Sequence, residues 1–133
     1  MKRLLSLALF AVLATTAVSC ADSTGPGTAI AGTYTLRSVG GTPMPVQFTT
    51  YRVISSEITL DAAGNYSSFT TEQDNFGTQN SYRIDGYWTV SGNEISLYDQ
   101  NAPAYPYVGA ISNRTITIYA NYSGSGYDEV YSK

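Results

Sequence analysis

The chain has 133 residues, a formal net charge of −3, no histidine and a single cysteine. Its few basic residues cannot neutralise nucleic-acid phosphates or dock on an anionic lipid surface. Without histidine or a second thiol, it cannot build a serine or cysteine nucleophile with a histidine base, and zinc and copper lack their usual ligands.

The first 20 residues have the pattern of a secretory signal peptide followed directly by the cysteine. Lys2 and Arg3 form a basic start, residues 4–14 are almost continuously apolar, and small residues precede Cys20. The apolar run is shorter than the roughly 20 residues that span a bilayer, but it fits the core of a cleavable signal. We therefore predict a lipoprotein signal peptide over residues 1–19 and lipidation of Cys20. The alternative is an ordinary secretory signal with a chance cysteine.

Cys20 and the residues after it predict how the protein is anchored and in which membrane. Two or more acyl chains on Cys20 would give stable membrane anchoring. Ala21 follows it, whereas an Asp there retains lipoproteins in the inner membrane in one bacterial sorting scheme. We therefore expect a lipid-anchored protein of the bacterial cell envelope, in the outer membrane, on a face that the sequence leaves open. Residues 20–29 are small, polar and rich in Gly, which predicts a flexible tether before a domain over 30–133.

From Ile30 onward, apolar and polar residues alternate with the period of a β-strand. Inward positions are expected at Tyr34 and Leu36, and then at Ile54, Ile58 and Leu60. Later inward pairs are Ile95 with Leu97 and Ile116 with Ile118. The eight predicted strands span residues 32–37, 51–60, 65–71, 82–90, 94–98, 107–111, 115–121 and 127–132. The polar segment 72–80 is expected to be a loop.

The order of these strands predicts an all-β fold. Turn residues break the pattern at short intervals, which predicts a single antiparallel meander of eight strands. Closing such a sheet hides its edges, which predicts a small barrel, with a flattened or partly open barrel as the alternative.

Several segments resemble one known group of barrels. Gly32-Thr33-Tyr34 resembles the Gly-x-Trp that opens lipocalin barrels, residues 58–66 and 86–97 resemble their hairpins, and residues 130–133 resemble the closing strand with its basic end. Over residues 30–133 the chain is therefore similar to the lipocalin-like (calycin-like) domains of bacterial lipoproteins. The resemblance implies a barrel floor closed by the first-strand aromatic and the last basic residue. Here these are Tyr34 and Lys133 in place of Trp and Arg.

Four aromatic residues are the candidate ligand-binding residues: Tyr34, Tyr66, Tyr82 and Trp88. An apolar lining with a few hydroxyls suits a small apolar or amphipathic ligand. The alternative is a filled core in which these rings pack on one another. The sequence thus predicts a non-catalytic binding module of the envelope.

The loop that contains Tyr105 and Tyr107 indicates an alternative function. Exposed tyrosines in a proline-bearing loop are typical contact residues for a protein partner, although the loop could instead cap one barrel end. In that interpretation the protein is a solid barrel that contacts another envelope protein as an inhibitor or assembly factor.

Neither catalysis nor a metal or other cofactor is predicted. Asp85, Glu94 and Asp99 fall on or near one hairpin and could form an acid–base pair, but turn and solvent-facing positions explain them better. We expect the protein not to be an enzyme.

Overall fold

The computed structural model of the protein describes residues 29–133. The expected signal peptide, Cys20 and most of the expected tether therefore lie outside the described residues. The described part forms one antiparallel β-sheet.

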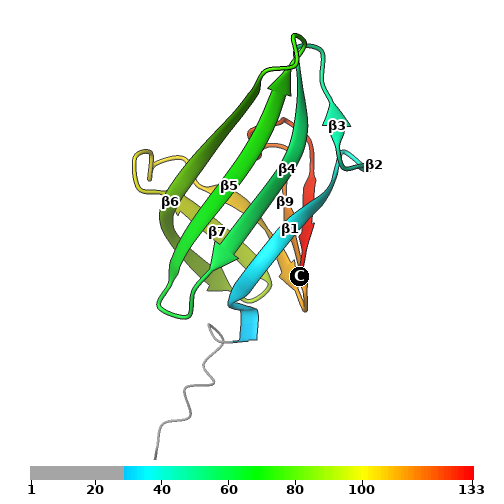
Figure 1. Ribbon diagram of the computed structural model, residues 1–133. Coiled ribbons are helices and arrows are strands. Elements are labelled where there is room, and N and C mark those ends of the chain that lie inside the picture. The colour runs from blue at the N-terminus through cyan, green and yellow to red at the C-terminus, as the bar shows by residue number, and fades with distance from the viewer. Residues whose placement is uncertain (1–28) are drawn as a thin grey trace, which may run out of the picture.

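Ten strands follow one another around this sheet (Figure 1). They are β1 (Gly32–Val39), β2 (Thr42–Pro43), β3 (Val46–Gln47), β4 (Tyr51–Leu60), β5 (Asn65–Asp74), β6 (Gln79–Ser91), β7 (Glu94–Asp99), β8 (Tyr107–Ser112), β9 (Thr115–Ile118) and β10 (Glu129–Ser132). β1 pairs with β10 on one side and with β4 on the other, so the eight longer strands close into a barrel. The predicted all-β, eight-stranded antiparallel barrel is confirmed, in its closed form.

The predicted alternation holds on most strands, and register shifts lie in two of them, in β1 between Leu36 and Ser38 and in β4. In β4 a bulge lies between Val53 and Ser55, and it turns Val53 inward in place of the predicted Ile54. One extra residue in a strand reverses the face of every residue before it, which a strict period-two pattern cannot anticipate. The buried residues that match the prediction are Tyr34, Leu36, Ile58, Leu60, Ile95, Leu97, Ile116 and Ile118.

The hairpin of β5 and β6 is longer than predicted. Glu72 pairs with Asn80, and Gln73 pairs with Gln79, so only residues 75–78 form the loop. Polar residues indicated a loop over 72–80, but the β6 side of this end is exposed to solvent, where polar side chains are compatible with strand pairing.

The strands β9 and β10 are shorter than predicted. Ala120 N–H donates to the Asp128 carboxylate (2.8 Å), and Ser123 N–H donates to the Tyr119 carbonyl (2.9 Å). The ladder between β9 and β10 ends at the pair of Ile118 and Glu129, and these turn bonds take the place of further ladder bonds beyond it. The expected strand ends at residues 121 and 127 are therefore wrong.

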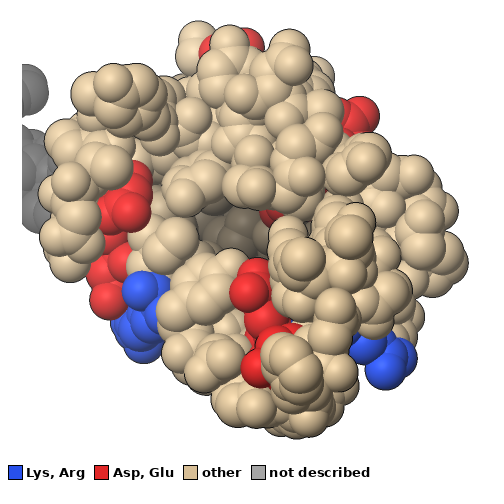
Figure 2. All heavy atoms as spheres, turned by 90° about the horizontal axis from the view of Figure 1, so that it is seen from above, with Lys and Arg blue, Asp and Glu red and all other residues tan. Residues whose placement is uncertain are grey.

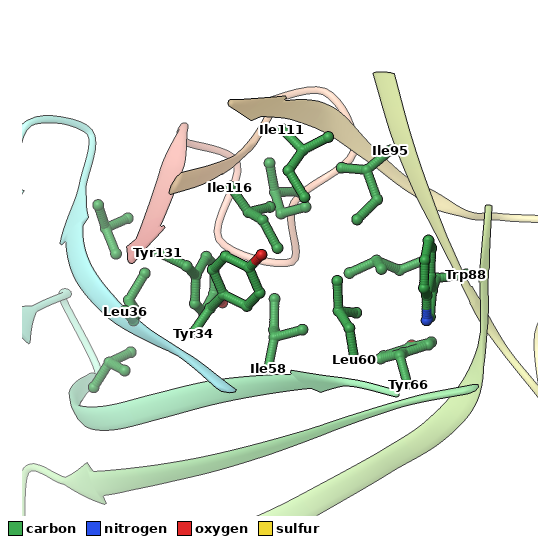
Figure 3. Close-up of a cluster of buried hydrophobic side chains, with 14 of the residues drawn as sticks. Tyr34, Leu36, Ile58, Leu60, Tyr66, Trp88, Ile95, Ile111, Ile116 and Tyr131 are labelled. Carbon is green, nitrogen blue, oxygen red and sulfur yellow. The ribbon is translucent and has the colours of Figure 1, made fainter. Parts of the chain in front are cut away.

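Side chains fill one end of the barrel, which we call the floor. Tyr34, Ile95 and Ile116 are fully buried there (Figure 3). The Lys133 ammonium lies 5.0 Å from the centre of the Tyr34 ring and donates to the Ala31 carbonyl (2.9 Å). The two residues expected at the floor therefore meet, and a cation over an aromatic face adds attraction to their packing.

Candidate functional site

The end of the barrel opposite the floor is hollow. A cavity of about 180 Å³ lies there and opens at the barrel mouth. Figure 2 views the molecule from above and shows this hollow at the centre of the face. Leu36, Ile58 and Leu97 are among its apolar lining residues. A hollow with apolar walls and an open mouth has the form of a small-molecule site.

Tyrosine hydroxyls and two glutamates line the cavity toward its mouth. The Tyr82 hydroxyl donates to Glu72 Oε1 (3.1 Å), and the Tyr131 hydroxyl donates to Glu129 Oε2 (2.9 Å). These pairs come from β5, β6 and β10, which the closed barrel brings around one cavity. Hydrogen bonds to ionised carboxylates are stronger than neutral ones, so the two glutamates are held in place.

Next to these pairs, two hydroxyls form a bond within the barrel wall. Ser56 on β4 and Thr70 on β5 are buried, with their oxygens 2.8 Å apart, and both line the cavity. A buried hydroxyl that has a partner avoids most of its desolvation cost. The polar side of the cavity is therefore built into the barrel wall.

The tyrosines of the cavity stay protonated well into alkaline conditions. Burial, the Glu72 charge and the hydrogen bond to Glu72 raise the pKa of Tyr82 to about 12. Burial and the Glu129 charge raise the pKa of Tyr131 well above its ordinary value. Both phenols are therefore hydrogen-bond donors at neutral pH.

The four aromatic residues proposed as ligand contacts divide into two pairs. Tyr34 and Trp88 belong to the filled floor, and their polar atoms are used there. The Tyr34 hydroxyl donates to the Ile30 carbonyl (2.6 Å), and Trp88 Nε1 donates to the Asp61 carbonyl (3.1 Å). Tyr66 and Tyr82, by contrast, line the cavity. Part of the predicted set thus faces a hollow, and part of it is the filled core of the alternative.

Tyr66 differs from the other buried aromatic residues in one respect. Its side chain is only 4% exposed, and its hydroxyl has no hydrogen-bond partner within residues 29–133. Burial and the neighbouring Tyr107 raise its pKa, so the hydroxyl keeps its proton. A buried polar group without a partner costs free energy, and such groups in native proteins call for an explanation.

The two tyrosines predicted as partner contacts lie in different environments. Tyr105 is 82% exposed in the segment between β7 and β8. Tyr107 begins β8, is half-buried, and lines the cavity. Tyr105 is thus free to contact a partner, and Tyr107 contributes to the cavity wall.

Sequence reasoning missed Glu72 and Glu129, the two acidic residues of the cavity. Glu72 was assigned to a loop, although it continues the inward series Tyr66, Ser68 and Thr70 at every second residue. Glu129 lies two residues before the buried Tyr131 on β10. Extending the alternation past the polar residues would have placed both carboxylates inside.

Two of the three carboxylates considered for acid–base chemistry make contacts with neighbouring residues. Asp85 forms an ion pair with Arg83 (2.7 Å), and Asp99 accepts from the Asn101 backbone N–H (2.7 Å) in a turn. Within residues 29–133, no group of three or more metal-ligating side chains comes together. The described residues also contain no helix long and apolar enough to cross a membrane.

Replacing Tyr66 with phenylalanine is expected to stabilise the ligand-free protein by about 1 kcal/mol, because a buried unpaired hydroxyl carries a cost of about 1–3 kcal/mol. Tyr34→Phe is the matched control, and it should destabilise by about 1 kcal/mol because its hydroxyl is bonded to the Ile30 carbonyl. Urea unfolding of the two variants measures both effects. A Tyr66→Phe protein less stable than the parent would contradict the assignment.

Alkaline pH is expected to destabilise the barrel. A tyrosine with a raised folded-state pKa contributes stability that is complete below the unfolded pKa of about 10 and is lost as pH rises through the folded pKa. Tyr131, which is 5% exposed, gives a slope of up to about 1.4 kcal/mol per pH unit above pH 10. Guanidinium unfolding between pH 8 and 12 measures this slope, which Tyr131→Phe should reduce. Constant stability across that range would refute the prediction.

Comparison with known proteins gives no match to a family model, a curated protein or a solved structure.

Proposed function

We propose that this protein is a lipid-anchored, lipocalin-like protein of the bacterial envelope that binds a small apolar or amphipathic molecule and carries out no catalysis. The observation that carries the proposal is the cavity of about 180 Å³ at the open end of the closed barrel. Drug-sized ligands occupy pockets of about 300–1,000 Å³, so the ligand of this cavity is smaller than those.

The position of the chain start supports the anchored arrangement. Ala29, the first described residue, lies at the floor, where the Lys133 ammonium reaches its carbonyl (3.4 Å). The described chain begins at the lower end of the barrel in Figure 1, whereas the hollow opens on the face that Figure 2 views from above. A tether from Cys20 would join the barrel at its closed end, which leaves the mouth accessible to solutes of the envelope.

Native mass spectrometry tests the binding function. The chain from Ala21 to Lys133, secreted behind a cleavable signal and purified without detergent, keeps every strand of the closed barrel. We expect extra mass from a co-purified small molecule. Ser68→Phe should abolish this mass because Ser68 lines the cavity, whereas Ser67→Phe, one residue along on the same strand, should retain it. An apo mass for all three proteins, with no uptake from a panel of small metabolites, would reject the function.

Membrane fractionation tests the anchor independently. The parent protein should sediment with membranes, and Cys20→Ser should release it into the soluble fraction, because only the lipidated cysteine holds it there. A membrane-bound Cys20→Ser protein would reject lipid anchoring at this residue.

One observation favours contact with a protein as a second candidate function. Tyr105 is 82% exposed beside a shallow hollow formed with residues 121–124. Crosslinking from Tyr105 in cells, with a photoreactive residue at this position, should then capture one envelope protein reproducibly. The same reagent at Phe76, which is exposed on a different loop, is the control.

A further inference from the structure

We infer that the cavity selects a small organic cation, a protonated amine on a short apolar body, with the ammonium group held by Glu72 and Glu129 at the mouth. The inference rests on the proposed function, because it names the ligand class of the same cavity.

The charges around the cavity have one sign. Its lining contains the two carboxylates and no lysine or arginine. Figure 2 shows acidic atoms at the rim of the hollow, whereas the basic side chains of this face lie at its periphery. Of the described cationic residues, Lys133 is at the floor, and the exposed ones are Arg37, Arg52, Arg83 and Arg114. Two carboxylates without a cation between them produce a negative potential that attracts a cationic ligand and repels an anionic one.

The two carboxylates are positioned to accept further hydrogen bonds. Tyr82 occupies Oε1 of Glu72, and Tyr131 occupies Oε2 of Glu129. Each bond fixes its carboxylate and uses one oxygen, so the other oxygen can accept from an ammonium group. An ammonium has three donors, which matches a site with two fixed acceptors.

Cavity size and wall chemistry limit the rest of the ligand. An apolar protein cavity of about 150 Å³ accommodates benzene, so the 180 Å³ here suits one ring or a short aliphatic chain. Ile58, Ile84 and Leu97 supply apolar walls for such a body. A long-chain fatty acid is disfavoured twice, by its length and by its negative headgroup.

The unpaired Tyr66 hydroxyl is an independent indication that the cavity holds a ligand. Tyr66 lies six residues before Glu72 on β5 and therefore lines the inner part of the cavity. Its side chain is more than nine-tenths buried, and its hydroxyl has no partner in the described part of the protein. A polar atom of the ligand or a water bound with it would satisfy this group.

A divalent metal ion is the competing cation, and the structure favours the amine. Metal sites in proteins draw on several oxygen ligands around the ion, carboxylates above all, and within residues 29–133 no three His, Cys, Asp or Glu side chains come together. The apolar walls below the carboxylates also have no role in binding a bare ion.

Three probes of one shape and different charge test the inference at pH 7.5. They are phenethylamine, 2-phenylethanol and 3-phenylpropanoate, titrated calorimetrically into the chain from Ala21 to Lys133. We expect phenethylamine to bind at least tenfold more tightly than the alcohol, and the carboxylate not to bind. Glu72→Gln and Glu129→Gln should each weaken amine binding about tenfold, because a neutral amide keeps the tyrosine bond but removes the charge. Glu57→Gln, on the exposed outer face of β4, should leave it unchanged.

Each outcome separates the inference from the proposed function. Equal binding of amine and alcohol, or amine binding unaffected by both Gln variants, overturns the selection for a cation but supports a small-molecule cavity. Binding of Ca²⁺ or Mg²⁺ that displaces the amine also overturns it. If no probe binds, the amine class is rejected, and co-purified mass in the native spectrum then decides whether the cavity binds another class.

Discussion

We expect the Gly86→Ala variant to lose about 3 kcal/mol or more of its free energy of unfolding, since overpacking alone costs about 1–3 kcal/mol and here the obstacle is backbone. A Cβ atom at Gly86 would lie 1.9 Å from the carbonyl oxygen of Tyr98 on the next strand and 2.8 Å from Cε1 of Tyr66. Neither the paired backbone of β7 nor the buried Tyr66 ring can move away without breaking other contacts. A small domain has only about 5–15 kcal/mol of total stability, so the loss is a large fraction of it.

Gly124→Ala is the matched control for this substitution. An added Cβ there meets no atom within 4 Å, so the stability should change by no more than about 0.5 kcal/mol. Guanidinium unfolding monitored by Trp88 fluorescence compares the two variants with the parent. If Gly86→Ala proves as stable as Gly124→Ala, then β6 and β7 do not approach each other at this point.

The second large effect is expected at Ile95. Ile95→Ala should destabilise the protein by about 3 kcal/mol, because Ile95 is completely buried in the filled floor and its removal leaves a void. Ile84→Ala removes the same atoms from a half-buried position that already borders the cavity. It should therefore cost about 1 kcal/mol and enlarge the cavity, because the truncation penalty grows with the new void.

Unfolding curves of both isoleucine variants give the comparison. The ratio of the two losses is the informative quantity, since both substitutions delete the same atoms and differ only in how deeply those atoms are buried. Equal losses would show that the mouth half is packed as tightly as the floor, and they would remove the basis for a binding cavity.

Alternation predicted the inward residues of β7 and β9 because these two strands are uninterrupted. Ile95, Leu97, Ile116 and Ile118 follow period two between clear turns, and their burial needs no knowledge of distant strands. The inward position predicted for Ile54 was wrong because the bulge depends on how β4 pairs with β5 in three dimensions. No residue type within the strand indicates a bulge there.

The residues that line the cavity were harder to predict from the sequence, for a different reason. Glu72 and Glu129 are far apart in the chain, and each is inconspicuous in its own polar segment. They line one cavity only because the barrel closes through β1, which pairs with both β4 and β10. Tyr34 and Tyr66 have the same pattern in the sequence, yet one fills the floor and the other borders the hollow. That difference depends on position along the barrel axis, which alternation does not encode.

Closure through β1 also has a consequence for the time course of folding. Leu36 pairs with Tyr131, so the first strand to be synthesised cannot complete its pairing until the strand almost at the other end of the domain has emerged. Such distant pairing makes folding slow compared with local hairpins, which form within microseconds. Hairpins such as β4–β5 can form early, but the barrel stays open until β10 arrives. A newly made chain therefore cannot complete the barrel during its synthesis. This would suit the secretion proposed above, because a chain secreted in the unfolded state crosses the membrane before it folds.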